Sequence, residues 1–168
     1  MADPDGLERL WAPYRMAYVR DAGTDTSGCP FCAMVAGERQ TDLIVVRGEH
    51  CFVAMNLYPY NPGHLMVLPH RHEADLTALT VAETSELMAL TQASISAIRR
   101  VSNPEGFNVG LNLGAVAGGS VSQHLHQHVV PRWGGDANFM TVVGRTKTLP
   151  QTIAESADLL RGAWGSEV

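Results

Sequence analysis

The sequence predicts an α+β fold, in which an antiparallel sheet carries one long helix and a second helix near the C-terminus. Two observations lead to this prediction. Residues 81–101 contain neither glycine nor proline and repeat apolar residues at helical spacing. Short β-rich runs stand before and after that stretch, at 43–47, 51–56, 64–68, 107–113 and 124–130. Strands grouped around one helix, rather than alternating with helices, are typical of an antiparallel sheet with helices on one side.

The first 28 residues are expected to form an arm and a connector, followed by a single domain over residues 29–168. Residues 6–20 mix aromatic, apolar and basic side chains around one proline, which favours a short helix or arm. Residues 21–28 are polar and include two glycines, as connectors often do. A short helix is then predicted over residues 30–37.

The first strands are separated by clear turn signals. Gly48 and Glu49 suit a hairpin turn, and Cys51, in the β-rich run that follows, is expected to be a core thiol. Residues 56–63 (NLYPYNPG) hold two prolines and should form a loop that returns the chain into the strand at 64–68.

The long helix should turn one apolar stripe toward the sheet. Its expected members are Leu87, Leu90, Ile98 and Val101, helped by Met88 and Ile95. The Asn-Pro-Glu-Gly sequence at 103–106 should end this helix. A final helix is predicted from about residue 150 to residue 164.

Composition limits the partners of this chain. Its 168 residues are 45% hydrophobic and 17% charged, with a net charge of −5, so we expect a globular protein without a basic surface for nucleic acid. Small phosphorylated ligands remain possible, because backbone amides and histidines bind them without much positive charge. No run approaches the ~20 apolar residues that span a membrane, and the first residues are not those of a secretory signal. We therefore expect a cytoplasmic protein.

Three alternating histidines, His124, His126 and His128, stand in the run SQHLHQHVVPR. On a strand they would share one face, about 7 Å apart. Chance alternation is the plain alternative, but three adjacent imidazoles gain nothing as core packing, which favours metal binding or catalysis. A neutral imidazole can attack phosphorus near pH 7 when a partner fixes its tautomer. The glycine-rich residues 114–122 just upstream could bring backbone amides to an anion. The alternative is a connecting loop that binds no ligand.

Two cysteines, Cys29 and Cys32, form a Cys-x-x-Cys pair. In a reducing compartment this spacing suits half of a metal site or a redox pair, and the two residues could also be ordinary thiols. A metal site would need two further ligands.

Taken together, these motifs resemble the histidine triad (HIT) family over roughly residues 29–133. The resemblance is carried by the His-x-His-x-His run, by Asn56 ahead of Pro-Gly-His-Leu-Met-Val at 62–67, and by the Gly-Gly-Ser sequence at 118–120. It implies a HIT-like fold and a nucleotide substrate. It also implies a catalytic nucleophile, His126, and a phosphate or leaving-group contact, His128. The implied substrate-binding residues are Asn56, Asn112, Gly119 and Ser120.

The resemblance also implies a metal site. In zinc-carrying members, two histidines complete the Cys-x-x-Cys pair, which here gives Cys29, Cys32, His72 and His124, with His70 as the alternative to His72. Four protein ligands leave no open position, so the zinc would be a structural cofactor.

Two flanking segments resemble the bacterial branch that cleaves diadenosine tetraphosphate with inorganic phosphate, giving ATP and ADP. They are RLWAPYRM at 9–16 and PRWGGDANF at 131–139. A hydrolase sharing the same first step is the alternative, and a non-catalytic nucleotide-binding protein is the second. A relative acting on nucleic-acid ends is disfavoured because no basic surface is expected. Arg132 or Lys147 could hold the acceptor phosphate, and the resemblance implies a homodimer joined through edge strands and the long helices.

Overall fold

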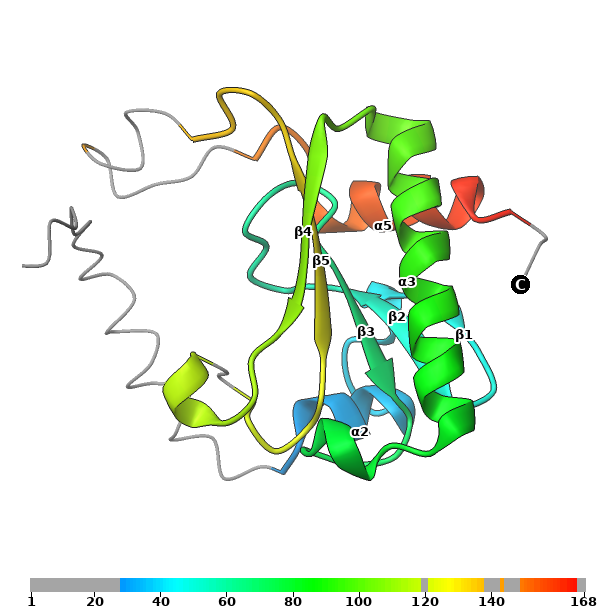
Figure 1. The fold of residues 1–168 in the computed structure, drawn as a ribbon. Coiled ribbons are helices and arrows are strands. Elements are labelled where there is room, and N and C mark those ends of the chain that lie inside the picture. The colour runs from blue at the N-terminus through cyan, green and yellow to red at the C-terminus, as the bar shows by residue number, and fades with distance from the viewer. Residues whose placement is uncertain (1–27, 119–120, 138–142, 144–148, 166–168) are drawn as a thin grey trace, which may run out of the picture.

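The computed structural model describes residues 28–118, 121–137, 143 and 149–165, and its centre is a five-stranded antiparallel sheet (Figure 1). The strands are β1 (Ile44–Arg47), β2 (Cys51–Met55), β3 (Leu65–Pro69), β4 (Gly106–Leu111) and β5 (Gln127–Arg132), in the spatial order β1-β2-β3-β5-β4. Each neighbouring pair is antiparallel. The described helices are α2 (Pro30–Val35), α3 (Val81–Ser102) and α5 (Ile153–Ala163), with short 3-10 turns at Thr41–Leu43, Leu76–Ala78 and Ala115–Ala117. The predicted α+β class is confirmed.

The long helix α3 covers β2, β3 and β5, on the same side of the sheet as α5 (Figure 1). It begins with a capping box, in which Thr80 and Glu83 each accept the other's backbone N–H. Part of the predicted apolar stripe is wrong, because Met88 and Val101 are 51% and 38% exposed.

The buried face of α3 includes two small polar residues that the predicted stripe left out. Thr91 and Ser94 are buried, and their hydroxyls donate to the carbonyls of Leu87 and Leu90 at 2.7 Å. Polar side chains that bond to their own helix can be buried at little cost, and a hydrophobicity pattern does not reveal them.

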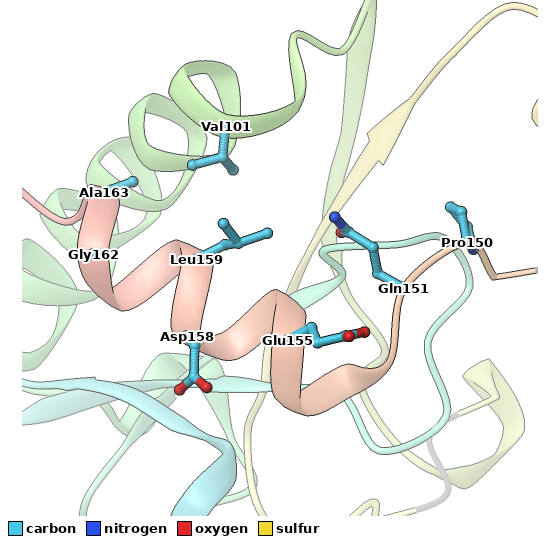
Figure 2. Close-up of a pocket in the computed structure, with 8 residues that line it drawn as sticks. All are labelled: Val101, Pro150, Gln151, Glu155, Asp158, Leu159, Gly162 and Ala163. Carbon is cyan, nitrogen blue, oxygen red and sulfur yellow. The ribbon is translucent and has the colours of Figure 1, made fainter.

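Helix α5 packs beside the end of α3 and next to β1. Figure 2 shows the open groove between the two helices, with Val101 of α3 facing Leu159 of α5. Neither a histidine nor a cysteine lines this groove, so the chemistry expected from the sequence lies elsewhere. None of the helices in the described part of the chain is both long and apolar enough to cross a membrane.

The β1–β2 turn is fastened to α3 by one carboxylate. Gly48 N–H donates to the carbonyl of Cys51 at 2.8 Å, which confirms the predicted hairpin. Glu86 of α3 accepts from the backbone N–H groups of Glu49, His50 and Cys51 at 2.8, 2.5 and 2.8 Å. These donors hold the pKa of Glu86 below its usual value, although burial acts in the opposite direction. Cys51 itself is fully buried, as predicted.

The predicted strand 124–130 is partly wrong, because β5 begins only at Gln127. His128 pairs with Met66 of β3 and Gly110 of β4, whereas His124 and His126 precede the ladder. Their segment makes other bonds: Leu125 N–H donates to the carbonyl of Glu73 at 2.6 Å. The two histidines are therefore held by a loop contact rather than by strand pairing.

Candidate active site and metal site

The third histidine lies on the face of the sheet away from α3. Gln127 donates its side-chain amide to Thr91 of α3 at 2.6 Å, so its neighbour His128 must point to the opposite face. The His126 ring lies on that same side, with its centroid 5.0 Å from that of His128. The alternation of the sequence thus brings these two rings together, although only His128 belongs to the strand.

Four predicted metal ligands converge. The sulfur and nitrogen atoms of Cys29, Cys32, His72 and His124 all lie within 4.8 Å of one another. The Nδ1 atom of His124 is 3.4 and 3.6 Å from the two sulfurs, and that of His72 is 3.2 Å from Cys32 Sγ. A tetrahedral zinc ion separates such ligand atoms by about 3.3–3.8 Å. The four residues could therefore hold a metal ion.

The surroundings of these ligands also suit a cation. His124 Nε2 lies 3.0 Å from the carbonyl oxygen of Pro69, so the ring donates there and directs the Nδ1 lone pair at the sulfurs, as ligating histidines usually do. Burial, with the nearby Cys29 thiol, raises the pKa of Cys32 to about 11. A bound cation would stabilise the thiolate and reverse this shift. The alternative ligand His70 turns away, with Nε2 3.0 Å from the carbonyl of Gly48 and its ring stacked on Phe52.

A salt-bridge cluster fixes the loop that carries His72. The Arg71 guanidinium contacts Glu73 at 2.7 Å and Glu83 at 3.0 Å, which ties the loop to the start of α3. Since Glu73 also accepts from Leu125 N–H, the same cluster reaches the histidine segment. The loop places the His72 ring next to that of His124, with the ring centroids 5.4 Å apart.

His126 is held as a neutral imidazole whose lone pair is on Nε2. Its Nδ1 lies 2.8 Å from the carbonyl oxygen of His124, which can only accept, so the proton sits on Nδ1 and the lone pair on Nε2. The residue is 6% exposed, and burial lowers the pKa of its imidazole. Phe31, between the two cysteines, packs against the rings of His124 and His126 at centroid distances of 5.5 and 5.2 Å.

A directed chain of hydrogen bonds fixes the tautomer of His128. Tyr60 N–H donates to Nδ1 of His64 at 3.0 Å, so the neutral His64 ring carries its proton on Nε2. That nitrogen lies 2.9 Å from Nδ1 of His128, which must accept. Burial lowers the pKa of His128 to about 4, helped by His126, so the ring is neutral with its proton on Nε2. This buried N–H has no hydrogen-bond partner in the described part of the chain and is ready for an acceptor.

The predicted substrate-binding residues are only partly placed. Asn56 follows β2 and lies against the His64 ring, with Nδ2 3.4 Å from Nδ1. Asn112 directly follows β4, half-buried. Gly119 and Ser120 lie outside the described residues. Asn56 is thus brought to His64, and Asn112 directly follows Leu111, the β4 residue that pairs with Gln127 of β5.

Arg132 is a poor candidate for the acceptor phosphate. Its guanidinium is bound to Asp136 at 2.6 Å and to Asn108 at 2.7 Å. It also stands at the far end of β5 from His126, and six residues of strand span about 20 Å. The hypothesis that Arg132 contacts a phosphate at His126 is therefore wrong, and Lys147 lies outside the described residues.

Comparison with known proteins assigns the family of this chain. A family model described as "HIT domain" matches residues 38–135, more than half of the chain. The chain belongs to the HIT family. The resemblance inferred from the histidine run is therefore confirmed, and both His126 and His128 lie within the HIT domain.

Individual relatives agree with this assignment. The chain is 49% identical to an AP-4-A phosphorylase of Mycobacterium tuberculosis (strain H37Rv) over 170 residues, covering 97% of this chain and 87% of that one. A Zn-bound histidine triad family protein from Mycobacterium smegmatis is similar in structure, with a TM-score of 0.68, 29% identity, and 82% and 94% of the two chains covered. Plasmodium falciparum diadenosine triphosphate hydrolase shares the fold, with a TM-score of 0.61, 18% identity, and 74% and 77% of the two chains covered. The protein is thus a nucleotide-processing enzyme of the HIT family.

Two features of this HIT site were not assigned a role from the sequence. His64 was noted only within the Pro-Gly-His motif, yet its ring joins Tyr60 to His128. Phe31 is one of the two residues between the cysteines, and its packing against the His126 ring was not predicted. The sequence signal for His64 was a histidine at the start of an apolar strand, because an imidazole carried into the core must find polar partners.

Proposed function

We propose that the protein cleaves diadenosine tetraphosphate by phosphorolysis, giving ATP and ADP, through a covalent adenylyl group on His126. The observation that carries this proposal is the geometry of His126. Its Nδ1–H is held by the carbonyl of His124, which leaves the lone pair on Nε2, and its ring centroid lies 5.0 Å from that of His128, whose buried N–H has no partner among the described residues. The 49% identity to an AP-4-A phosphorylase, over nearly the whole chain, supports the choice of substrate.

The first step is attack of His126 Nε2 on the α-phosphorus of one adenosine. An N–P bond forms, the bond from phosphorus to the bridging oxygen breaks, and ATP leaves. The Nε2–H of His128 donates a hydrogen bond to a phosphate or leaving oxygen. Since the neutral His128 is a donor only at Nε2, its tautomer decides whether this bond can form. Asn56 would contact the nucleoside.

The second step transfers the adenylyl group to inorganic phosphate. A phosphate oxygen attacks the same phosphorus, the N–P bond breaks and ADP leaves, which restores the neutral His126. Asn112, Gly119 and Ser120 are the proposed phosphate-binding residues. Water in place of phosphate would give AMP, and this hydrolase is the alternative function.

The proposed cofactor is one structural zinc ion held by Cys29, Cys32, His72 and His124. The donor set and the spacing of its atoms fit zinc. With four protein ligands, such an ion supplies folding free energy rather than Lewis-acid chemistry. Because the carbonyl of His124 orients His126, the protein's own contacts connect this site to the nucleophile.

We further propose that the enzyme is a homodimer. Strand β4 lies at the edge of the sheet, with Val109 46% exposed and Leu113, just beyond it, 48% exposed. An apolar edge strand is stabilised by pairing with another chain. The implied partner is a second copy.

Product analysis tests the function. Diadenosine tetraphosphate is incubated with the enzyme at increasing phosphate concentration, and the nucleotides are separated by chromatography. The proposal expects ATP plus ADP, at a rate that rises and saturates with phosphate. ATP plus AMP at a rate indifferent to phosphate would establish the hydrolase instead. A His126→Ala variant is the control and should show no turnover of either kind while keeping the wild-type circular dichroism.

A further inference from the structure

Asp136, in the sequence PRWGGDANF that begins at residue 131, is the centre of a hydrogen-bond network. Its carboxylate accepts from Arg132 Nε at 2.6 Å and Nη2 at 3.1 Å. The Trp133 backbone N–H and the Asn61 side-chain amide donate to the same carboxylate at 3.3 and 2.7 Å. The Asp136 side chain is only 11% exposed, so these bonds are sheltered from water. Charged acceptors of this kind make the stronger hydrogen bonds of proteins.

Asn61, whose amide donates to Asp136, belongs to the loop 56–63, which joins β2 to β3 (Figure 1). Asn61 is 2% exposed, and its amide also donates to the carbonyl of Pro131 in β5 at 2.8 Å. One side chain therefore fastens the loop to the end of β5. The carbonyl of Asn61 accepts from His64 N–H at 3.1 Å, so the turn that leads into β3 depends on the same residue.

The fastened loop carries groups that the active site uses. Asn56 begins the loop and lies against the His64 ring, and Tyr60 N–H sets the tautomer of that ring. His64 in turn holds His128. A path of hydrogen bonds thus runs from Asp136 through Asn61 and the loop to His128. The match to the HIT domain ends at residue 135, so Asp136 stands just outside the part that the family model covers.

We propose that Asp136 is a positioning residue, which holds the nucleoside-binding loop 56–63 in register with His128. It acts through Asn61 and does not itself contact the substrate. The kinetic part of this inference rests on the proposed function, whereas its spectroscopic part does not.

The substitution that tests it is Asp136→Asn, which keeps the shape of the side chain. Every hydrogen-bond neighbour of the carboxylate is a donor, so an amide NH₂ in that place meets a donor in either orientation. The matched control is Asp158→Asn on α5. Asp158 also pairs with an arginine at 2.6 Å, but it is 77% exposed and far along the chain from the loop.

Two readouts separate positioning from simple loss of folded protein. In Asp136→Asn, KM for diadenosine tetraphosphate should rise about tenfold, because a displaced loop misplaces Asn56. Loss of folded enzyme would lower kcat and leave KM unchanged. The ¹⁵N shifts of the ring nitrogens should show a single tautomer for His64 and His128 in the wild type, and mixed tautomers in the variant. Asp158→Asn should match the wild type in both.

An unchanged KM together with unchanged ring tautomers in a folded Asp136→Asn protein would overturn the inference. If the wild type turns over no diadenosine tetraphosphate, the proposed function fails, and the ring tautomers still decide the positioning role. If Asp136→Asn does not fold, the same readings are made on Asp136→Ser, whose shorter side chain does not reach the Asn61 amide. There too we expect a raised KM and mixed tautomers, and wild-type values of both would overturn the inference.

Discussion

Replacing His64 tests whether the hydrogen-bond chain to His128 matters for catalysis. His64 is fully buried, and phenylalanine would preserve its ring and the packing of Tyr60, whose centroid lies 4.7 Å away. His64→Phe removes the Nε2–H that donates a hydrogen bond to Nδ1 of His128 at 2.9 Å. An unsatisfied buried polar group costs about 1–3 kcal/mol, and 1.4 kcal/mol is tenfold in rate. If that cost falls on the transition state, kcat should decrease about 5- to 150-fold.

The His64→Gln variant is the matched control. Its amide nitrogen reaches about as far as Nε2 of histidine and can donate to His128 again, so most of the lost rate should return. The assay is steady-state formation of ATP and ADP at saturating phosphate, with unfolding in urea measured in parallel. A folded His64→Phe protein with kcat within about twofold of the wild type would refute the reasoning, and so would a His64→Gln variant that is no faster than His64→Phe.

Four other predictions follow from the same structure. Metal analysis should find about one zinc per chain, and Cys32→Ser should lose it and melt at lower temperature. The free energy of unfolding, measured with urea, should be highest above pH ~6.5 and fall as the pH decreases toward 4. The reason is that His126 and His128 are neutral in the folded protein and take up protons when it unfolds. Each histidine can lower the free energy of unfolding by up to about 1.4 kcal/mol per pH unit. Gly48→Ala should destabilise by about 1–3 kcal/mol, since its Cβ would stand 2.3 Å from Glu86 Oε1, and the added effect should shrink in a Glu86→Ala background, where the clashing atoms are gone. Light scattering should give the mass of two chains, and the mass of one chain at micromolar concentration would contradict the dimer.

The strands and long helix could be predicted because their apolar runs are local signals. The four residues that converge as possible metal ligands could also be predicted, with His72 rather than His70, because their spacing resembles a known family. The strand boundary was missed because the loop contact between Leu125 and Glu73, far apart in sequence, replaces ladder pairing before Gln127.

The supporting contacts of the site could not be predicted for a related reason. Asn61 and Asp136 are 75 residues apart, and neither type of residue is unusual in a loop. Their meeting depends on β3 and β5 being neighbours in the sheet, which strand-rich runs alone do not specify. The role of His64 depends on the same adjacency, because its partner His128 lies on β5.

The most direct test of the account is to trap the covalent intermediate. The enzyme is mixed with diadenosine tetraphosphate without phosphate, quenched within milliseconds under conditions that preserve phosphoramidates, and digested for mass spectrometry. The account predicts one adenylyl group on His126, formed in a burst with an equal amount of ATP and lost when phosphate is added. Turnover with no adduct at His126, or with the adenylyl group on another residue, would contradict it.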